Sequence, residues 1–395
     1  MKFNTEISVG LPLPFGSINI LSIPLNFNNI FDSYKELKSF ITKNFASEDI
    51  ANLFKRSFKE IFKDQFTEGS ERGGWGKAYR DRFFRDLFGN SLPSDSVVHP
   101  HSITYSMWVL EGLNAAFNKE NSFLNLDDIN SVKLEKIFDE IADYFRRHFD
   151  EKTGGVGPRW SGIDNVEQVA TNVRHASSGL IAFLLLPGFL METQKTAKYI
   201  IDSIQKGNPF KGVRALSISA MLRALFTIKE NKILLQGLFR EKFLLDQIIS
   251  NGEMELLSRF DRERKVWDVN QPGSQSAKIW YSIFVLKSLP QLQESKNIDI
   301  VNLYKECLNY LIDEQLIVFN SGSGLPYIPG EKPDLGMTSV LINILKKDKI
   351  FENKKKRSLI KSLLHFIINN YENSEVTKYT YSWTWAMVFP AFCST

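Results

Sequence analysis

Two kinds of helical segment alternate along this chain. Segments of the first kind carry apolar residues three and four positions apart on one face and charged residues on the other, as around 50–62, 134–149, 197–204, 235–244, 301–311 and 359–367. Segments of the second kind open with small or hydroxylated residues and are then apolar on nearly all sides; six of them begin near His99, Asn172, Arg214, Ser274, Asp334 and Lys378. A helix of the second kind needs packing on several sides. The alternation therefore predicts an all-α fold with two concentric layers, an α/α toroid of six hairpins.

The first thirty residues depart from the helical pattern. They alternate apolar and polar positions, contain Pro and Gly between positions 10 and 16, and continue into a segment at 17–23 with the character of an extended strand. We predict a short extended N-terminal arm over residues 1–30 that lies on the ring. Residues 31–395 are then a single toroid domain.

Loop lengths distinguish the two ends of the predicted ring. Connections from an outer to an inner helix are long and rich in Gly, Pro, Trp and charge, as at 66–100, 150–171, 251–273 and 317–333, whereas connections from an inner to an outer helix are short, as at 188–192 and 229–234. Long loops on one face of a rigid scaffold commonly carry binding residues. We therefore expect the mouth of a central cavity at the long-loop end.

One loop carries a recognisable motif. Gln65 ends an outer helix and is followed by Gly73, Gly74 and Trp75. This arrangement resembles the repeat motif of squalene and oxidosqualene cyclases and of prenyltransferase-like toroids, the terpenoid cyclase-like superfamily. In that family the Gln side chain ties helix ends together and the Trp stacks over them. Weaker copies at 148–157 and 313–326 lack the Trp, so the resemblance implies a repeated toroid over roughly residues 30–395.

The chain departs from that family in its catalytic motifs. Squalene-type cyclases protonate their substrate with an Asp-x-Asp-Asp motif, which is missing here. Protein prenyltransferases and lanthipeptide cyclases of this fold bind zinc through Cys and His, but Cys307 and Cys393 are placed in an outer helix and at the end of the chain. We expect a divergent toroid with neither activity, with no metal site and with no cofactor.

Composition narrows the class of protein. A hydrophobic content of 43% and 31 Phe residues are enough for a large core, and two Cys are too few for a disulfide framework. The net charge of +4 is too balanced to indicate a nucleic-acid or membrane-surface partner. The N-terminal residues lack the apolar stretch of a signal peptide and no segment is long and apolar enough to span a bilayer, so we expect a cytoplasmic protein. Richness in Lys, Asn, Ile and Phe is typical of an AT-rich bacterial genome.

Two Lys-rich stretches, 346–349 and 354–357, are interpreted as a solvated loop and helix start, because they lack the interleaved aromatic residues of a nucleic-acid site.

Polar and aromatic residues are expected to gather at the long-loop end. The acid–base candidates are His101, Glu167 and His175. The candidates for ligand binding are Trp160, Asp164, Arg174, Trp267, Asp268, Tyr327 and Trp383. Trp160 and Trp267 would form a stacking platform, and Arg174 would bind an anion.

Each candidate also has a structural alternative. His101 and His175 can bond to a neighbouring loop as helix-start residues, the Trp residues can pack between layers, and Arg174 can pair with Asp164 or Glu167.

Two functions fit this pattern. The first is a non-catalytic toroid that binds a small molecule, a peptide or a partner protein in its cavity or on its loop face. The alternative is a carbohydrate-active or terpenoid-type enzyme, a hydrolase, lyase or isomerase, that uses His and Glu at the cavity mouth; this rests on analogy between folds. No carboxylate pair stands at a motif spacing that would distinguish retaining from inverting chemistry. The sequence leaves the oligomeric state open.

Overall fold

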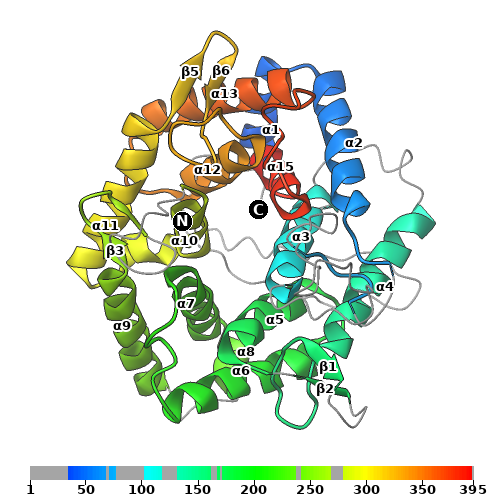
Figure 1. The fold of residues 1–395 in the computed structure, drawn as a ribbon, viewed down its shortest axis with the longest axis vertical. Coiled ribbons are helices and arrows are strands. Elements are labelled where there is room, and N and C mark those ends of the chain that lie inside the picture. The colour runs from blue at the N-terminus through cyan, green and yellow to red at the C-terminus, as the bar shows by residue number, and fades with distance from the viewer. Residues whose placement is uncertain are drawn as a thin grey trace, which may run out of the picture.

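Two concentric layers of helices form a closed ring (Figure 1). The computed structural model describes residues 34–67, 71–76, 102–117, 131–161, 167–169, 171–236, 242–267 and 279–393. The predicted N-terminal arm lies outside the described residues. Within them, no helix combines the length and apolar character needed to cross a membrane.

The inner layer consists of the segments predicted to be apolar on all sides. Each packs against the next around the ring, and the last returns to the first. Ala, Ser and Gly alternate with Leu and Ile on these helices, which allows close packing on several sides. The inner helices are α3 (Ser102–Phe117), α5 (Val173–Leu185), α7 (Ala215–Glu230), α10 (Ile279–Ser288), α12 (Leu335–Lys347) and the short pair α14 (Ser382–Trp385) and α15 (Val388–Phe392).

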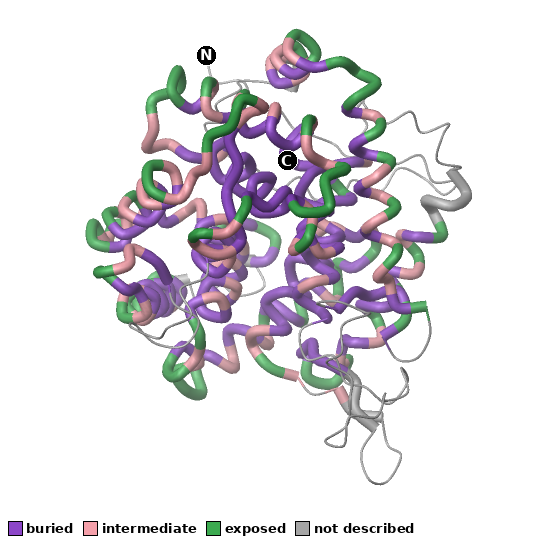
Figure 2. The backbone as a smooth tube through the Cα atoms, turned by 45° about the horizontal axis from the view of Figure 1, so that its top comes forward, coloured by how far each residue is buried: buried purple, intermediate pink, exposed green. Residues whose placement is uncertain are grey.

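The outer layer consists of one-sided helices. Each of them except α2 packs on the inner helix that precedes it in the sequence, and α2 packs on the last inner helices, α14 and α15. Their apolar stripes face the ring and their charged faces lie outside, so that burial falls from the centre outward (Figure 2). The outer helices are α2 (Ser47–Lys63), α4 (Ser131–Arg147), α6 (Leu190–Gln205), α9 (Lys242–Ser258), α11 (Ile298–Asn309) and α13 (Asn353–Asn370). Two shorter helices accompany them, α1 (Tyr34–Asn44) and α8 (Lys232–Gln236).

The ring is closed by helices from distant parts of the sequence. The outer helix α2 packs against α14 and α15, and these in turn contact α3. Phe54 on α2 meets the edges of Phe389 and Phe392, with ring centroids 5.1 and 6.0 Å apart. Gly112 on α3 lies so close to Ala386 that a Cβ added to it would be 2.2 Å from the Ala386 carbonyl oxygen.

Short antiparallel hairpins occupy the connections from outer to inner helices. They are β1 (Arg159–Ser161) with β2 (Glu167–Val169), β3 (Phe260–Asp261) with β4 (Val266–Trp267), β5 (Ile317–Phe319) with β6 (Gly322–Gly324), and the single bridges Gln65–Trp75 and Phe149–Val156. The structure thus confirms a repeated unit in the long connections.

The Trp75 motif has a second copy that the sequence analysis missed. The indole N–H of Trp75 donates to the Ile61 carbonyl at 2.9 Å, and its backbone N–H donates to the Ser106 hydroxyl at 2.8 Å. Trp267 makes the same two bonds, to the carbonyl of Leu256 at 3.1 Å and to the hydroxyl of Ser282 at 2.9 Å. In both copies the indole therefore adds a hydrogen bond to a carbonyl in the last turn of an outer helix, beside the backbone N–H that the carbonyl accepts from Asp64 or Arg259.

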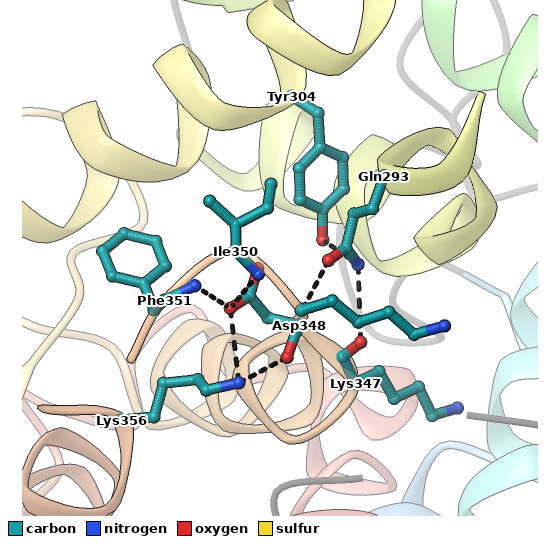
Figure 3. Close-up of polar contacts among 8 residues, drawn as sticks. Gln293, Tyr304, Lys347, Asp348, Ile350, Phe351 and Lys356 are labelled. Atoms are coloured by element: carbon teal, nitrogen blue, oxygen red, sulfur yellow. Dashed lines mark hydrogen bonds and ion pairs between the residues drawn. The ribbon is translucent and has the colours of Figure 1, made fainter. Parts of the chain in front are cut away.

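The turn between α12 and α13 corrects one prediction. Lys346, Asp348 and Lys356 were expected to be solvated, but all three are buried. One carboxylate oxygen of Asp348 accepts the backbone N–H groups of Ile350 and Phe351 at 3.2 and 2.9 Å, and it lies 3.6 Å from the Lys356 ammonium (Figure 3). A buried charge is stable when it is paired and hydrogen-bonded, as here. The solvated interpretation holds for Lys354 and Lys355, which are exposed.

Lys346 is held by the end of the ring-closing segment. Its ammonium donates to the Pro390 carbonyl at 2.6 Å and to the carbonyl of Cys393. Burial lowers the pKa of Lys346 to about 7. The side chain therefore anchors α15 rather than meeting solvent.

Candidate functional site

Aromatic side chains converge where the inner helices begin. Trp383 lies at the centre, with ring centroids 5.3 Å from Tyr105, 5.2 Å from Trp108, 5.0 Å from Phe284 and 5.9 Å from Tyr381. We call this set the opening cluster, made of Tyr105, Trp108, Trp280, Phe284, Tyr327, Tyr379, Tyr381 and Trp383. It combines aromatic faces with several hydroxyl and indole groups, as binding sites for polar organic ligands do.

Three polar groups of this region have no hydrogen-bond partner within the described part of the chain. They are the indole N–H groups of Trp280 and Trp383 and the hydroxyl of Ser382. Trp383 and Ser382 are each only 1% exposed. Leaving a buried donor unpaired costs about 1–3 kcal/mol, so native proteins rarely do so without a functional reason. These groups therefore keep an unused hydrogen-bonding capacity within the described part of the chain.

Arg174 is the charged residue beside the opening cluster. It is the second residue of α5 and is half-buried, and within the described residues it forms no ion pair. Burial lowers the pKa of Arg174, the phenol groups of Tyr105 and Tyr281 oppose that change, and Arg214 adds to it. Arg174 lines a narrow space of about 10 Å³ along the ring axis, which is room for one water molecule. A guanidinium in such a position favours an anionic ligand.

His175 takes the structural role that the sequence analysis weighed for it. The Asn172 side chain accepts the His175 backbone N–H at 2.9 Å and so caps α5. Its amide nitrogen lies 2.7 Å from Nδ1 of the His175 ring. Because an amide nitrogen donates, Nδ1 accepts and the ring proton lies on Nε2. The imidazole is buried against this cap.

Asp334 is a buried acid near the same end of the ring. It caps α12 by accepting the Met337 backbone N–H at 2.8 Å, and its other oxygen accepts the Thr380 hydroxyl at 2.9 Å. Burial raises its pKa to about 7, although these hydrogen bonds act in the opposite direction. Both oxygens accept hydrogen bonds inside the protein, so Asp334 holds the start of α12 to the loop that carries Thr380.

The structure brings together three of the residues selected from the sequence. Arg174 and Trp383 meet at Tyr105, and Tyr327 joins the same cluster by stacking on Trp280 at 6.0 Å and on Tyr379 at 5.1 Å. Burial raises the pKa of Tyr105 to about 12, while Arg174 lowers it and Tyr381 raises it further.

Trp267 lies apart from the opening cluster. It is fully buried and its indole N–H is bonded to an outer helix, so the expected stacking role does not fit this side chain. Trp160 and Glu167 belong to β1 and β2, of which the structure describes only the backbone register, Trp160 opposite Gln168 and Ser161 opposite Glu167. His101, Asp164 and Asp268 lie outside the described residues.

Tyr105, Trp280 and Tyr381 were missed by the sequence analysis. Each lies at or within the first turn of an inner helix. That position was the available signal, because the first turns of all inner helices meet at one end of a ring. In the described part of the chain, no group of three or more His, Cys, Asp or Glu is arranged to hold a metal ion.

Comparison with known proteins identifies a fold. No protein-family model matches the chain, and no curated protein matches it significantly. A sugar epimerase from a ruminal bacterium superposes with a TM-score of 0.51 at 8% identity, over 87% of this chain and 98% of the epimerase. An unsaturated glucuronyl hydrolase from Streptococcus agalactiae gives 0.47 at 12% identity, over 92% and 96% of the two chains. A mannosylglycerate hydrolase from Thermus thermophilus gives 0.31 at 11% identity, over 90% and 99%. The chain has the α/α-toroid fold, and the epimerase, which superposes over most of both chains, is named for its action on sugars.

Proposed function

We propose that this protein acts on a carbohydrate that carries an acidic group and binds it at the opening cluster. The observation that carries the proposal is Arg174, a half-buried cation that forms no ion pair among the described residues and stands beside aromatic side chains with unpaired donors. A ligand carboxylate, sulfate or phosphate would pair with the guanidinium. The first turns of the inner helices add partial positive charge at the same end.

The remaining groups suit a sugar ring. Its apolar face can stack on Tyr105, Tyr381 or Trp280, which are only half-buried. Its hydroxyl oxygens can accept from the indole groups of Trp280 and Trp383 and from Ser382. These donors favour a hydroxylated ligand over a hydrocarbon, and so favour carbohydrate over terpenoid chemistry. Kinship with the terpenoid cyclase-like superfamily stays a prediction.

Arg174 provides the test of ligand binding. We expect Arg174→Gln to weaken binding of glucuronate or galacturonate at least ten-fold, because a charge-assisted hydrogen bond contributes about 1.5–3 kcal/mol. The measurement is quenching of tryptophan fluorescence on titration, since Trp383 lies in the site. Arg262→Gln is the matched control, because Arg262 is exposed. Equal affinities of the native and Arg174→Gln proteins would refute the proposal, as would tighter binding of neutral glucose than of either acid.

Catalysis is the second part of the proposal. His101 and Glu167 remain the acid–base candidates, and Asp164 and Asp268 remain candidates for ligand binding, because the described residues place no carboxylate beside Arg174. NMR spectroscopy of the sugar during incubation with the native protein distinguishes an enzyme from a protein that only binds the sugar. Conversion that is lost in Glu167→Gln supports an enzyme. Binding without conversion supports the alternative, a binding toroid for the same ligand.

A further inference from the structure

A second cavity lies at the opposite end of the ring, where the inner helices end. It has a volume of about 220 Å³ and is lined by side chains from the last turns of the inner helices. We call it the basal cavity; its polar lining includes Glu111, Arg223, Lys287, Gln291, Asn343 and Lys347. Ile181 and Arg223 also border the narrow space beside Arg174, so a constriction separates the two ends of the ring axis.

Positive charge predominates inside the basal cavity. Glu111 accepts from Lys287 at 2.7 Å and from Arg223, so this one carboxylate is shared by two cations. Burial raises the pKa of Glu111, but the two cations more than offset it and lower it to about 2. Lys347 is a third cation on the same wall, and Glu230, which is exposed, adds a second carboxylate at the rim.

The Lys347 side chain lies on the side of the basal cavity, with Glu111, Arg223 and Lys287, and not on the side of the neighbouring turn. Figure 3 shows its side chain extending away from the Asp348–Lys356 pair. Burial lowers the pKa of Lys347 to about 8, with a further lowering from Arg223 and an opposing contribution from Glu111. The Lys347 ammonium therefore lies close enough to interact electrostatically with Glu111 and with its partner Arg223.

Two lining residues of the cavity also carry side-chain oxygens that lack donors among the described residues. Asn343 is 6% exposed, and its amide N–H donates to the Met387 carbonyl at 3.1 Å, but its side-chain oxygen has no partner among the described residues. The side-chain oxygen of Gln291 is likewise without one in that part of the chain. A ligand with hydroxyl groups would supply the missing donors.

Helix dipoles account for only part of this arrangement. The C-terminal end of a helix carries partial negative charge, which favours Lys287 and Lys347 in the last turns of α10 and α12. It does not account for the open volume or for unpaired acceptor oxygens, because a purely structural cluster would be packed closed and satisfied.

We infer that the basal cavity binds a small polyhydroxylated anion, a sugar phosphate or a sugar acid. Lys347, with Lys287 and Arg223, would bind the anionic group, and Asn343 and Gln291 would accept from hydroxyl groups. A space of about 220 Å³ is about twenty times that beside Arg174 and suits a ligand the size of one monosaccharide unit. This site is separate from the opening cluster and does not depend on the function proposed there.

Calorimetric titration with glucose 6-phosphate and with gluconate tests the inference and distinguishes the two kinds of anion. We expect at least one of these probes to bind more tightly than glucose or inorganic phosphate alone. Lys347→Gln should weaken that binding at least ten-fold, and Leu185→Trp, which fills the cavity from its apolar wall, should weaken it without changing charge. Lys355→Gln, on the exposed face of α13, should leave it unchanged.

The controls make the result decisive. Thermal unfolding followed by circular dichroism shows which variants fold. If Lys347→Gln does not fold, the affinity of Leu185→Trp for the probe tests the inference instead. Lack of binding by both probes at millimolar concentration overturns the inference, and so does unchanged binding in whichever cavity variants fold. Loss of binding in Arg174→Gln with retention in Lys347→Gln would place the probe at the opening cluster and equally overturn it.

Discussion

Trp267 and Trp383 differ in whether their indole N–H has a partner. Both are buried, but Trp267 donates to the Leu256 carbonyl whereas Trp383 donates to no described residue. Replacing either by Phe removes similar apolar surface. We expect Trp267→Phe to lower the free energy of unfolding by about 0.5–1.5 kcal/mol more than Trp383→Phe, because only the former loses a hydrogen bond, while the Leu256 carbonyl keeps its bond from the Arg259 backbone N–H. Urea denaturation followed by circular dichroism gives the comparison. Equal losses would show that the Leu256 bond contributes nothing.

For single residues, the sequence predicted the role of Arg174 but not the burial of Lys346. Arg174 could be selected because a charge that leads into an apolar run needs a partner or a cavity. The burial of Lys346 could not be predicted, because it depends on carbonyls of Pro390 and Cys393, more than forty positions away in the sequence. Local pattern identifies a lysine-rich segment, and only tertiary packing decides which of its side chains are covered.

Single helices behave largely as their pattern predicts, and α12 shows the chemistry of one helix start. Its cap Asp334 has a pKa raised by burial to about 7. Between about pH 4 and pH 7 the folded protein therefore retains a proton that the unfolded chain has released, so the stability from this group is complete below about pH 4 and is lost as the pH rises to 7. Over that interval we expect the native protein to lose up to about 4 kcal/mol relative to Asp334→Asn, at 1.36 kcal/mol per pKa unit. Thermal or urea unfolding of both proteins from pH 4 to 8 measures the difference. A difference that does not change with pH would contradict the assignment.

The alternation of all-apolar and one-sided helices was enough to predict both layers, because each kind of stripe requires a different number of packing partners. The opening cluster was predicted only in part. Tyr327 and Trp383 were selected for their place near loops, whereas Tyr105 and Trp280 lie inside helices and come into contact with Trp383 only when the ring closes. The basal cavity was not predicted, since short connections gave no sign of it.

The whole molecule depends on the contact that closes the ring. Gly112 allows α3 to approach Ala386, and an added methyl group would collide with the backbone there. We expect Gly112→Ala to lower the free energy of unfolding by about 1–3 kcal/mol, because rigid backbone cannot move aside as a flexible side chain does. Gly207→Ala is the control, since nothing lies within 4 Å of the added atom, and its effect should stay within about 0.5 kcal/mol. Urea unfolding of the two variants decides; equal stabilities would mean that the α3 contact is not tight.

The pairing of α2 with α14 and α15 also sets an order of events during synthesis. A ribosome makes the chain from the N-terminal side, and α2 has its inner partners only after residues 382–393 have emerged. Until then the apolar face of α2 and one side of α3 stay uncovered in the nascent chain. The ring can therefore close only after both its first outer helix and its last inner helices have been made.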